Sequence, residues 1–372
     1  MMLGLIEIRR RKLQFVLVGL IVALVTYLVL MVNGLGIGLR ELSGRALRNW
    51  DADALVYADT ANLSVIRSEI GQSTVDRARA LPGVTDAAEL GYFGVNVKKP
   101  DGSISQKAKS AALIGFDLGT IGQPAVTAGR QLTPADRDGV LADKGFLRAT
   151  DLKVGDTVTL GYRLTSGQFR IVGEIDEGAF FFQPTLYVLR PTWQEMRYGT
   201  GGPETPVASI VLLKGEGLPG KSGEGFTVVD KDTAFNNIEG VSAQNSTVNA
   251  LMAFGYLIGA LIIGVFFYVL TLQKVAQIGV LKAVGASTFF VARQILAQVL
   301  ALALAGVAVA VPLAYLTNAA LQQASATVPI AFTTSAFVIT ALAMVCTSLV
   351  GALFSVRQVA QVDPIIALGQ QQ

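Results

Sequence analysis

Four long apolar stretches dominate the chain, and most charged residues lie between them. The stretches cover residues 15–39, 248–272, 289–317 and 332–356. A helix needs about 20 apolar residues to cross a hydrocarbon core of roughly 30 Å. The pattern therefore predicts four transmembrane helices.

Residues 40–247, between the first and second stretches, have the pattern of a soluble α+β domain. Short alternating runs predict strands at 54–57, 94–97, 111–115, 157–161, 169–174, 185–189, 208–213 and 226–229. Helices are predicted at 73–80, 134–142, 144–149 and 191–196. The fold class is therefore an α-helical membrane protein with an inserted α+β domain. A split of this domain into two lobes near residues 117–131 stays open.

The composition agrees with a membrane protein and excludes several kinds of site. The 372 residues are 52% hydrophobic and 15% charged, with a mean hydropathy of +0.51, which is too apolar for an ordinary soluble protein. Histidine is absent, which excludes His-based acid–base catalysis and His-containing zinc and haem sites. The single cysteine, Cys346, allows no intrachain disulfide, and we expect it to be a buried apolar residue. No intrinsic cofactor and no nucleic-acid partner are expected.

Basic residues in the short loops predict the orientation of the chain, because Lys and Arg remain on the cytoplasmic side. The basic positions are Arg9, Arg10, Arg11 and Lys12, then Lys274 and Lys282, then Arg357. The loop at 318–331 is uncharged and is expected outside. Both termini are thus predicted to be cytoplasmic in a multi-pass protein of the cell membrane, with residues 357–372 as a tail. Residues 1–14 are either an interfacial helix or a topogenic charge cluster.

The segment at 273–288 is a short polar interruption between two apolar stretches. Its Val275, Ile278, Leu281 and Val284 have helical spacing, and Gly285 ends the pattern. Nothing within so short a loop can cover an apolar stripe, so we expect a protein partner. The alternative is a helical turn lying on the membrane.

Soft and aromatic side chains near the outer ends of the first two spans suggest a ligand surface. Tyr27 and Met31 lie in the first span, and Met252 and Tyr256 lie in the second. If the two helices are antiparallel neighbours, the four residues lie at one depth, although a methionine in a span often only packs. Gly34, Gly36 and Gly38 allow close backbone approach. In the inserted domain, the run Phe180–Phe182 is either a core strand or an apolar surface.

Several motifs resemble those of the FtsX-like, MacB-type ABC permeases. Residues 277–287, QIGVLKAVGAS, are similar to the family signature EIGVLRALGAS, with Gln277 where the family usually has Glu. Residues 362–368, VDPIIAL, are similar to its closing DPxxAL motif. The inserted domain resembles the family's extracytoplasmic module at LPGV (81–84), at Gly129-Arg130 and at LKVGDTV (152–158).

This resemblance implies an assembly of two permease copies with two cytoplasmic ATPase subunits. The chain has no G-x-x-x-x-G-K-[ST] loop, so we expect it not to be an enzyme and its partner to bind ATP and Mg. The family's corresponding loop docks on the ATPase. The residues implied in this coupling are Gln277, Ile278, Gly279, Leu281, Lys282 and Gly285.

The N-terminal half is also similar to the haem-efflux (HrtBA-type) permeases of Gram-positive bacteria, at LIEI (5–8), Lys12-Leu13, Tyr27-Leu28, Gly34-Leu35, Asn49-Trp50 and NLS (62–64). This similarity implies that haem enters between the first two spans of a dimer. Met31 is then the candidate iron ligand, with Tyr27 and Tyr256 packing on the ring or ligating. No other metal site is expected. The alternatives are a lipoprotein or lipid exporter, a drug or peptide exporter, and a signalling permease that transports nothing.

Overall fold

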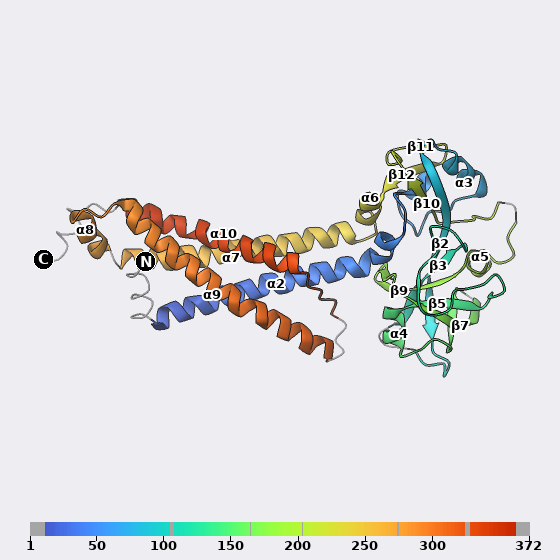
Figure 1. Ribbon diagram of the computed structural model, residues 1–372, viewed down its shortest axis with the longest axis horizontal. Coiled ribbons are helices and arrows are strands. Elements are labelled where there is room, and N and C mark those ends of the chain that lie inside the picture. The colour runs from blue at the N-terminus through green and yellow to red at the C-terminus, as the bar shows by residue number, and fades with distance from the viewer. Residues whose placement is uncertain are drawn as a thin grey trace. The chain divides into compact units, whose positions relative to one another are not determined.

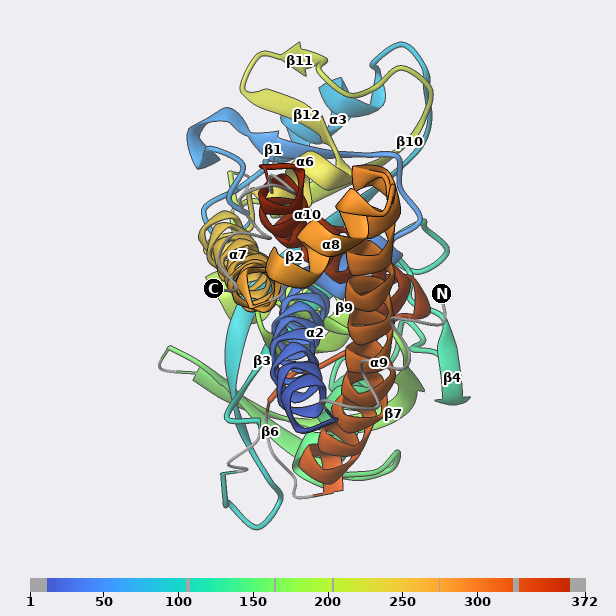
Figure 2. The ribbon, with the colours of Figure 1, turned by 90° about the vertical axis from the view of Figure 1, so that its left-hand side faces the viewer.

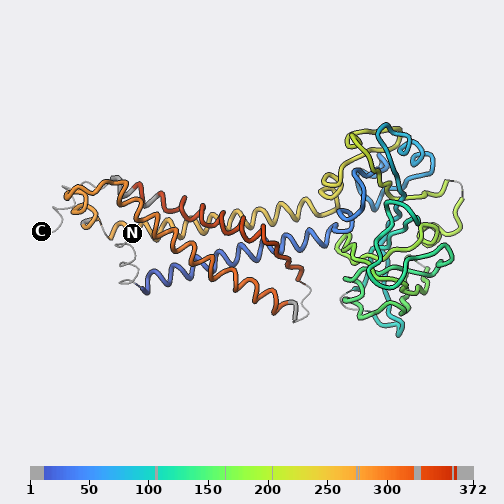
Figure 3. Tube along the Cα trace, viewed as in Figure 1, coloured from blue at the N-terminus to red at the C-terminus, as the bar shows by residue number. Residues whose placement is uncertain are grey.

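The computed structural model describes residues 12–104, 108–163, 165–202, 204–273, 275–323 and 328–361. It divides into two compact units, Met1–Gly38 with Asn245–Gln372, and Leu39–Gln244. We call them the helical unit and the β-rich unit and describe each by itself. The chain leaves the helical unit through its first helix and returns through its second (Figure 3). Most of the predicted interfacial helix and the motif at 362–368 lie outside the described residues.

Four helices are long and apolar enough to cross a membrane, as the sequence predicts. They are α2 (Lys12–Asn49), α7 (Val241–Leu272), α9 (Thr288–Gln323) and α10 (Thr334–Gln361) (Figure 1). Each helix runs past its apolar stretch at one end or both, because the flanking polar residues continue the helical backbone. The fold class is thus confirmed: four apolar helices, with a β-rich region inserted between the first and the second.

Helix α2 lies between α7 and α9 (Figure 2). A Cβ atom added to Gly255 of α7 would lie 2.6 Å from Cγ2 of Val29 of α2, and one added to Gly306 of α9 would lie 2.7 Å from Cγ1 of Val22. Small residues therefore let the backbones approach closely, as is common between membrane helices. The order of the contacts along each helix makes α2 antiparallel to α7 and parallel to α9.

The glycines of α2 also make close contacts. A Cβ atom on Gly36 would lie 2.7 Å from Cγ1 of Val248, and one on Gly38 would overlap the carbonyl oxygen of Pro329. The amide of Ala331 donates a hydrogen bond to the carbonyl of Gly34 over 3.0 Å. The predicted close backbone approach at these glycines is therefore confirmed.

The expectation of a buried Cys346 is wrong. Its side chain is exposed on α10. An apolar span places only part of its circumference against other helices, so an apolar residue type does not indicate which side it occupies.

The β-rich unit contains twelve strands within the described residues. They are β1 (Ala54–Ala58), β2 (Val84–Lys98), β3 (Ser110–Phe116), β4 (Val126–Gly129), β5 (Gly139–Asp143), β6 (Thr157–Tyr162), β7 (Thr165–Ile175), β8 (Ala179–Phe180), β9 (Gln183–Leu189), β10 (Ile210–Gly215), β11 (Ser222–Gly223) and β12 (Phe226–Asp230). The shorter helices are η1 (Asp59–Ala61), α3 (Gln72–Arg79), α4 (Lys144–Thr150), α5 (Arg190–Tyr198) and α6 (Lys231–Asn236).

All eight predicted strands are present, but the helix predicted at 134–142 is wrong. Residues Gly139–Asp143 form the buried strand β5, which pairs with β7 and β9. A short apolar run does not distinguish a buried strand from a helix turn by periodicity. Asp143 then caps α4 by accepting a hydrogen bond from the amide of Gly145 over 2.7 Å.

Six strands close into a small barrel in the order β2, β3, β9, β5, β7, β6 and back to β2. Closure leaves these strands no free edge along the ring. Alternate residues of each strand point inward and fill the barrel. The inward residues are Phe93, Val95, Val97, Ala111, Leu113, Val140, Ala142, Val158, Leu160, Phe169, Ile171, Leu186 and Val188.

Strand β2 belongs to two lobes. Its residues 84–90 pair with β10, and its residues 91–98 pair with β3 and β6. The second lobe consists of β10, β1, β12 and β11 with helix α3, which packs on β2 and β10. The β-rich unit therefore does contain two lobes, but they meet within β2 and not near residues 117–131.

The run Phe180–Phe182 is part core and part surface. Phe180 is fully buried, whereas Phe182 is 41% exposed. Phe181 and Phe182 form the turn between β8 and β9 with φ of 51° and 61°, the left-handed conformation that this type of hairpin turn requires. Their amides donate to the carbonyls of Ser43 and Leu42, each over 2.9 Å, next to the non-helical residue Gly44 of α2.

Candidate functional site

One side of α2 carries a row of leucines that no described residue of the helical unit covers. The row consists of Leu13, Leu17, Leu20, Leu24 and Leu28, each more than half exposed. Their spacing of three and four residues places them on one face of the helix. Met31, three residues after Leu28, continues this row and is half-buried. We call the row the α2 stripe.

Helix α7 carries a similar row, which we call the α7 stripe. It consists of Leu251, Phe254, Ile258, Leu261, Val265 and Tyr268, spaced alternately by three and four residues and all exposed. Phe254 is the most exposed of them, at 62%. Because α2 and α7 run antiparallel and touch at Val29 and Gly255, Met31 and Phe254 lie at nearly the same depth.

The structure brings two of the four candidate ligand residues together and separates the other two from them. Tyr27 and Met31 pack in one cluster with residues of α9 and α10. The hydroxyl of Tyr27 donates to Oγ1 of Thr317 on α9 over 3.1 Å. Tyr256 belongs to a different cluster, which includes Met344 of α10. Met252 and Tyr256 lie well round α7 from its exposed stripe, so they face the inside of the four-helix arrangement.

The sequence places Phe254 at the outer end of the second span with Met252 and Tyr256, but it does not single out Phe254 as a ligand candidate. The signal was present, since exposed apolar residues recur along α7 with heptad-like spacing. That spacing separates Phe254 from Met252 and Tyr256, which are candidates because of their residue type and depth.

A single hydroxyl group links three of the four helices. The Nδ2 atom of Asn33 on α2 donates to Oγ1 of Thr340 on α10 over 2.7 Å. The hydroxyl of Tyr256 on α7 forms a hydrogen bond with Thr340 as well. Thr340 is fully buried. A polar group in an apolar interior needs its partners, so this group fixes α2, α7 and α10 relative to each other.

Replacing Thr340 by valine should therefore destabilise the helical unit. Thr340→Val keeps the shape but leaves the Asn33 amide and the Tyr256 hydroxyl without this partner, at an expected cost of about 1 to 3 kcal/mol. Thermal unfolding of the full chain in detergent measures the effect. Thr340→Ser, which keeps the hydroxyl, is the matched control. Equal melting temperatures for the two variants would contradict the assigned role.

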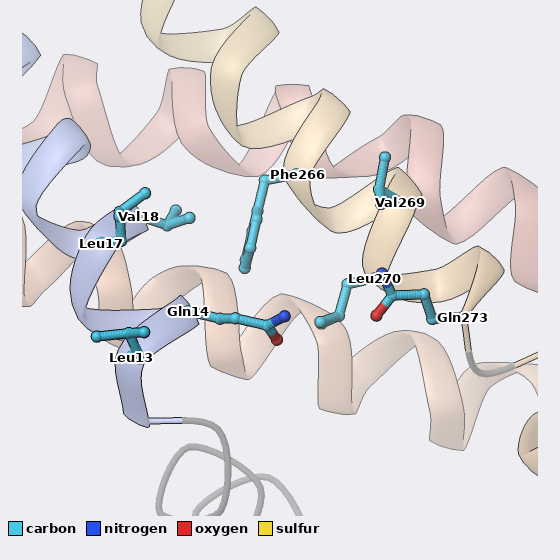
Figure 4. A pocket seen from close by; sticks show the side chains of 8 residues that line it. All are labelled: Leu13, Gln14, Leu17, Val18, Phe266, Val269, Leu270 and Gln273. Atoms are coloured by element: carbon cyan, nitrogen blue, oxygen red, sulfur yellow. The ribbon is translucent and has the colours of Figure 1, made fainter.

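An apolar groove lies between α2 and α7 at the end of the helical unit that contains Gln14 and Gln273. It has a volume of about 240 Å³. Figure 4 shows Phe266 and Leu270 of α7 projecting toward the side chains of α2. The α2 residues that line it are Leu13, Gln14, Leu17 and Val18. The groove therefore adjoins the Leu13 and Leu17 end of the α2 stripe, and its surface is almost entirely apolar.

The predicted coupling segment forms helix α8 (Val275–Ala283). Its apolar residues do not form a single free stripe. Ile278 is buried and packs, together with Val275, on Val291 and Ile295 of α9. Gly279 is buried too, whereas Gln277 is exposed.

The end of α8 presents the exposed apolar side chains. Leu281 is 40% exposed and Val284 is 85% exposed. Gly285 has φ of 101°, and its amide donates to the carbonyl of Lys282 over 3.0 Å while the amide of Ala286 donates to Leu281 over 2.9 Å. These are the two hydrogen bonds of a Schellman motif. The sequence thus predicts the end of the helix at Gly285 correctly, and the motif holds Leu281 and Val284 in place. We call these two residues the α8 patch.

The Asp136 carboxylate of the β-rich unit has a structural partner. Asp136 accepts two hydrogen bonds from Arg130, each over 2.7 Å, and Arg130 with Thr133 holds the pKa of Asp136 well below its usual range. Among the described residues, no group of three His, Cys, Asp or Glu side chains could hold a metal ion.

Comparison with known proteins defines the class of this chain. Residues 249–364 match the family described as FtsX-like permease C-terminal, so α7 to α10 form an FtsX-like permease domain. This is the kind of permease domain that residues 277–287 predict.

The chain is similar to particular proteins along most of its length. It is 26% identical over 370 residues to a protein of Staphylococcus haemolyticus named as hemin transport system permease protein HrtB, a match that covers 98% of this chain and 97% of the other. It is also 26% identical over 312 residues to an uncharacterized ABC transporter permease of Mycobacterium tuberculosis, with 83% of each chain covered. Among solved structures, the periplasmic region of MacB from Actinobacillus actinomycetemcomitans matches at 17% identity and a TM-score of 0.35, with 51% of this chain and 94% of that one covered.

Proposed function

We propose that this chain is the permease subunit of an ABC efflux transporter that removes haem, or a similar amphiphile, from the membrane. The observation that carries the proposal is the similarity to a hemin transport permease along nearly the whole chain. The uncovered α2 and α7 stripes support it, because a planar apolar ligand needs a flat apolar surface that faces the bilayer.

In this proposal two copies of the chain assemble with two ATPase subunits, which bind ATP and Mg. Both termini are cytoplasmic and the β-rich unit is outside, in agreement with the basic residues Lys12, Lys282 and Arg357 on one side. The α8 patch, with Gln277 and Lys282 beside it, docks on the ATPase. Closure of the ATPase pair then moves α7, which directly precedes α8 in the chain.

Met31 is the proposed iron ligand. It continues the α2 stripe, so a two-fold axis facing that stripe would bring two Met31 thioethers together. With no histidine in the chain, a thioether is one of the few side chains that can ligate haem iron. Phe254 at the same depth offers its ring for stacking on the porphyrin. The hydroxyl of Tyr27 donates a hydrogen bond to Thr317, and its ring packs beside the ligand. Tyr256 and Met252 lie on the inward side of α7, away from the ligand.

A hemin titration of the purified full chain tests the proposal. We expect a Soret shift in the wild type and at least about tenfold weaker binding in Met31→Leu, which corresponds to the loss of ~1.4 kcal/mol or more. Met252→Leu is the matched control, since it removes a thioether of similar depth that faces inward. Absence of a shift in the wild type would overturn haem as the ligand, and equal losses in both variants would overturn the role of Met31.

A lipid or lipoprotein exporter is the second candidate. The groove between α2 and α7 favours it, because its lining is almost wholly apolar and would accept an acyl chain. ATPase activity of the complex that rises with a lipopeptide but not with hemin would identify this function instead.

A further inference from the structure

A second groove runs along the opposite side of α2, between α2 and α9. Its volume is about 450 Å³, nearly twice that of the groove beside α7. Its lining includes Gly19, Leu20 and Ala23 of α2, and Leu302 and Ala305 of α9. Lys12 closes one end. The groove shares Leu20 with the α2 stripe, but Met31 and Phe254, the proposed haem-contacting residues, do not line it.

The groove exists because small residues occupy its floor. Gly19 has no side chain, and Ala23 and Ala305 have only a methyl group. A Cβ atom on Gly19 would lie 3.5 Å from Cδ2 of Leu302, which is ordinary contact, so the two helices touch at the floor of the groove. The larger side chain of Leu20 is more than half exposed and forms a wall.

The length of the groove fits one leaflet of a bilayer. Lys12 and Ala23 are eleven residues apart, and a helix rises 1.5 Å per residue, so the groove extends roughly 16 Å from Lys12 to Ala23. This is about half of the ~30 Å hydrocarbon core. A single acyl chain, with its headgroup at the membrane surface, has the reach to fill such a groove.

The charge at the end of the groove distinguishes it from the groove beside α7. Lys12 is exposed and directly precedes the first apolar stretch, so it is expected at the membrane boundary, where its ammonium group would attract an anionic headgroup. The groove beside α7 ends instead in the neutral amides of Gln14 and Gln273. The α2 stripe, and not this groove, extends along the helix as far as Met31.

We propose that the groove between α2 and α9 is a binding site for an anionic phospholipid, whose phosphate contacts Lys12 and whose acyl chain lies over Gly19, Ala23 and Ala305. The site is independent of the molecule that the transporter exports. One lysine contributes about 1 kcal/mol of attraction to anionic lipid, which corresponds to a preference of about fivefold over a zwitterionic lipid.

Native mass spectrometry of the detergent-purified full chain tests the site, with phosphatidylglycerol and phosphatidylcholine as probes. We expect phosphatidylglycerol to be retained about fivefold better, Lys12→Ala to abolish this preference and Lys12→Arg to keep it. Ala305→Leu, which fills the groove, should reduce retention of both lipids. Arg293→Ala is the matched control, because Arg293 is exposed at a similar depth on the other side of α9 and should have no effect.

Three results would overturn the proposal. Equal retention of both lipids by the wild type would indicate ordinary annular lipid. The same loss of preference in Arg293→Ala as in Lys12→Ala would indicate a general effect of surface charge. A loss of dimer in Ala305→Leu, with lipid retention unchanged, would show that a second copy of the chain covers the groove. Hemin binding by the same preparations reports on the export proposal separately.

Discussion

Leu281→Asp is expected to abolish transport while leaving ligand binding intact. In the proposed complex the ATPase covers this exposed position of the α8 patch. A carboxylate there would have to lose its hydration, and an unpaired buried charge is strongly unfavourable. We expect the ATPase subunit to co-purify at a small fraction of the wild-type amount. Hemin binding should stay within about twofold of the wild type, a difference of ~0.4 kcal/mol, because the α8 patch and Met31 lie at opposite ends of the helical unit.

Leu281→Met is the matched control, since it keeps an apolar side chain of similar volume. Gly285→Pro tests the same surface through the backbone. It removes the amide that donates to Lys282 and forces φ from 101° to about −65°, so it should displace the α8 patch and uncouple the complex as well. Loss of hemin binding in Leu281→Asp would show that coupling and binding are not separable.

Trp193→Ala is expected to destabilise the β-rich unit by about 3 to 5 kcal/mol. Trp193 of α5 is fully buried and packs with the inward-facing residues of the barrel. A Cβ atom on Gly115 would lie 2.5 Å from the Trp193 Cβ atom, and one on Gly91 would overlap the indole. The two glycines make the space that the ring fills. Their backbones cannot move in to close a cavity because β2 and β3 are paired on the barrel wall.

Chemical denaturation of the full chain measures this effect, with circular dichroism monitoring the loss of the β-strand signal. Trp193→Phe is the control. It keeps an aromatic ring, and it removes no hydrogen bond, since within the described residues the indole N–H has no partner. A destabilisation by alanine no larger than that by phenylalanine would show that the site collapses around the smaller residue.

Much of the fold follows from local patterns in the sequence. Apolar length alone predicts the four membrane helices, and alternation predicts the eight main strands. The sequence pattern does not predict strand β5, because Gly139–Asp143 is buried on both faces and shows no alternation. The closure of the barrel depends on pairings between distant strands, such as β5 with β9, and no local pattern specifies these.

The sequence predicts which residue types form the site, but it does not predict on which side of each helix they lie. The sequence indicates Tyr27, Met31, Met252 and Tyr256 because they are soft or aromatic at one depth. In the structure, Tyr256 contacts Thr340 inside the helical unit, whereas Phe254 is exposed. The side of a membrane helix that stays free depends on its neighbours. The contacts of α7 with Val29 and with Gly351 fix its rotation, and both partners are distant in sequence.

Strand β2 has a consequence for how the β-rich unit loses its structure. Its residues 84–90 and 91–98 are parts of one continuous backbone that serves two lobes, so neither lobe can melt without removing a wall from the other. The two lobes should therefore unfold in a single cooperative step and act as one rigid lever. Because no hinge separates the two lobes, a movement of one lobe would move the other with it.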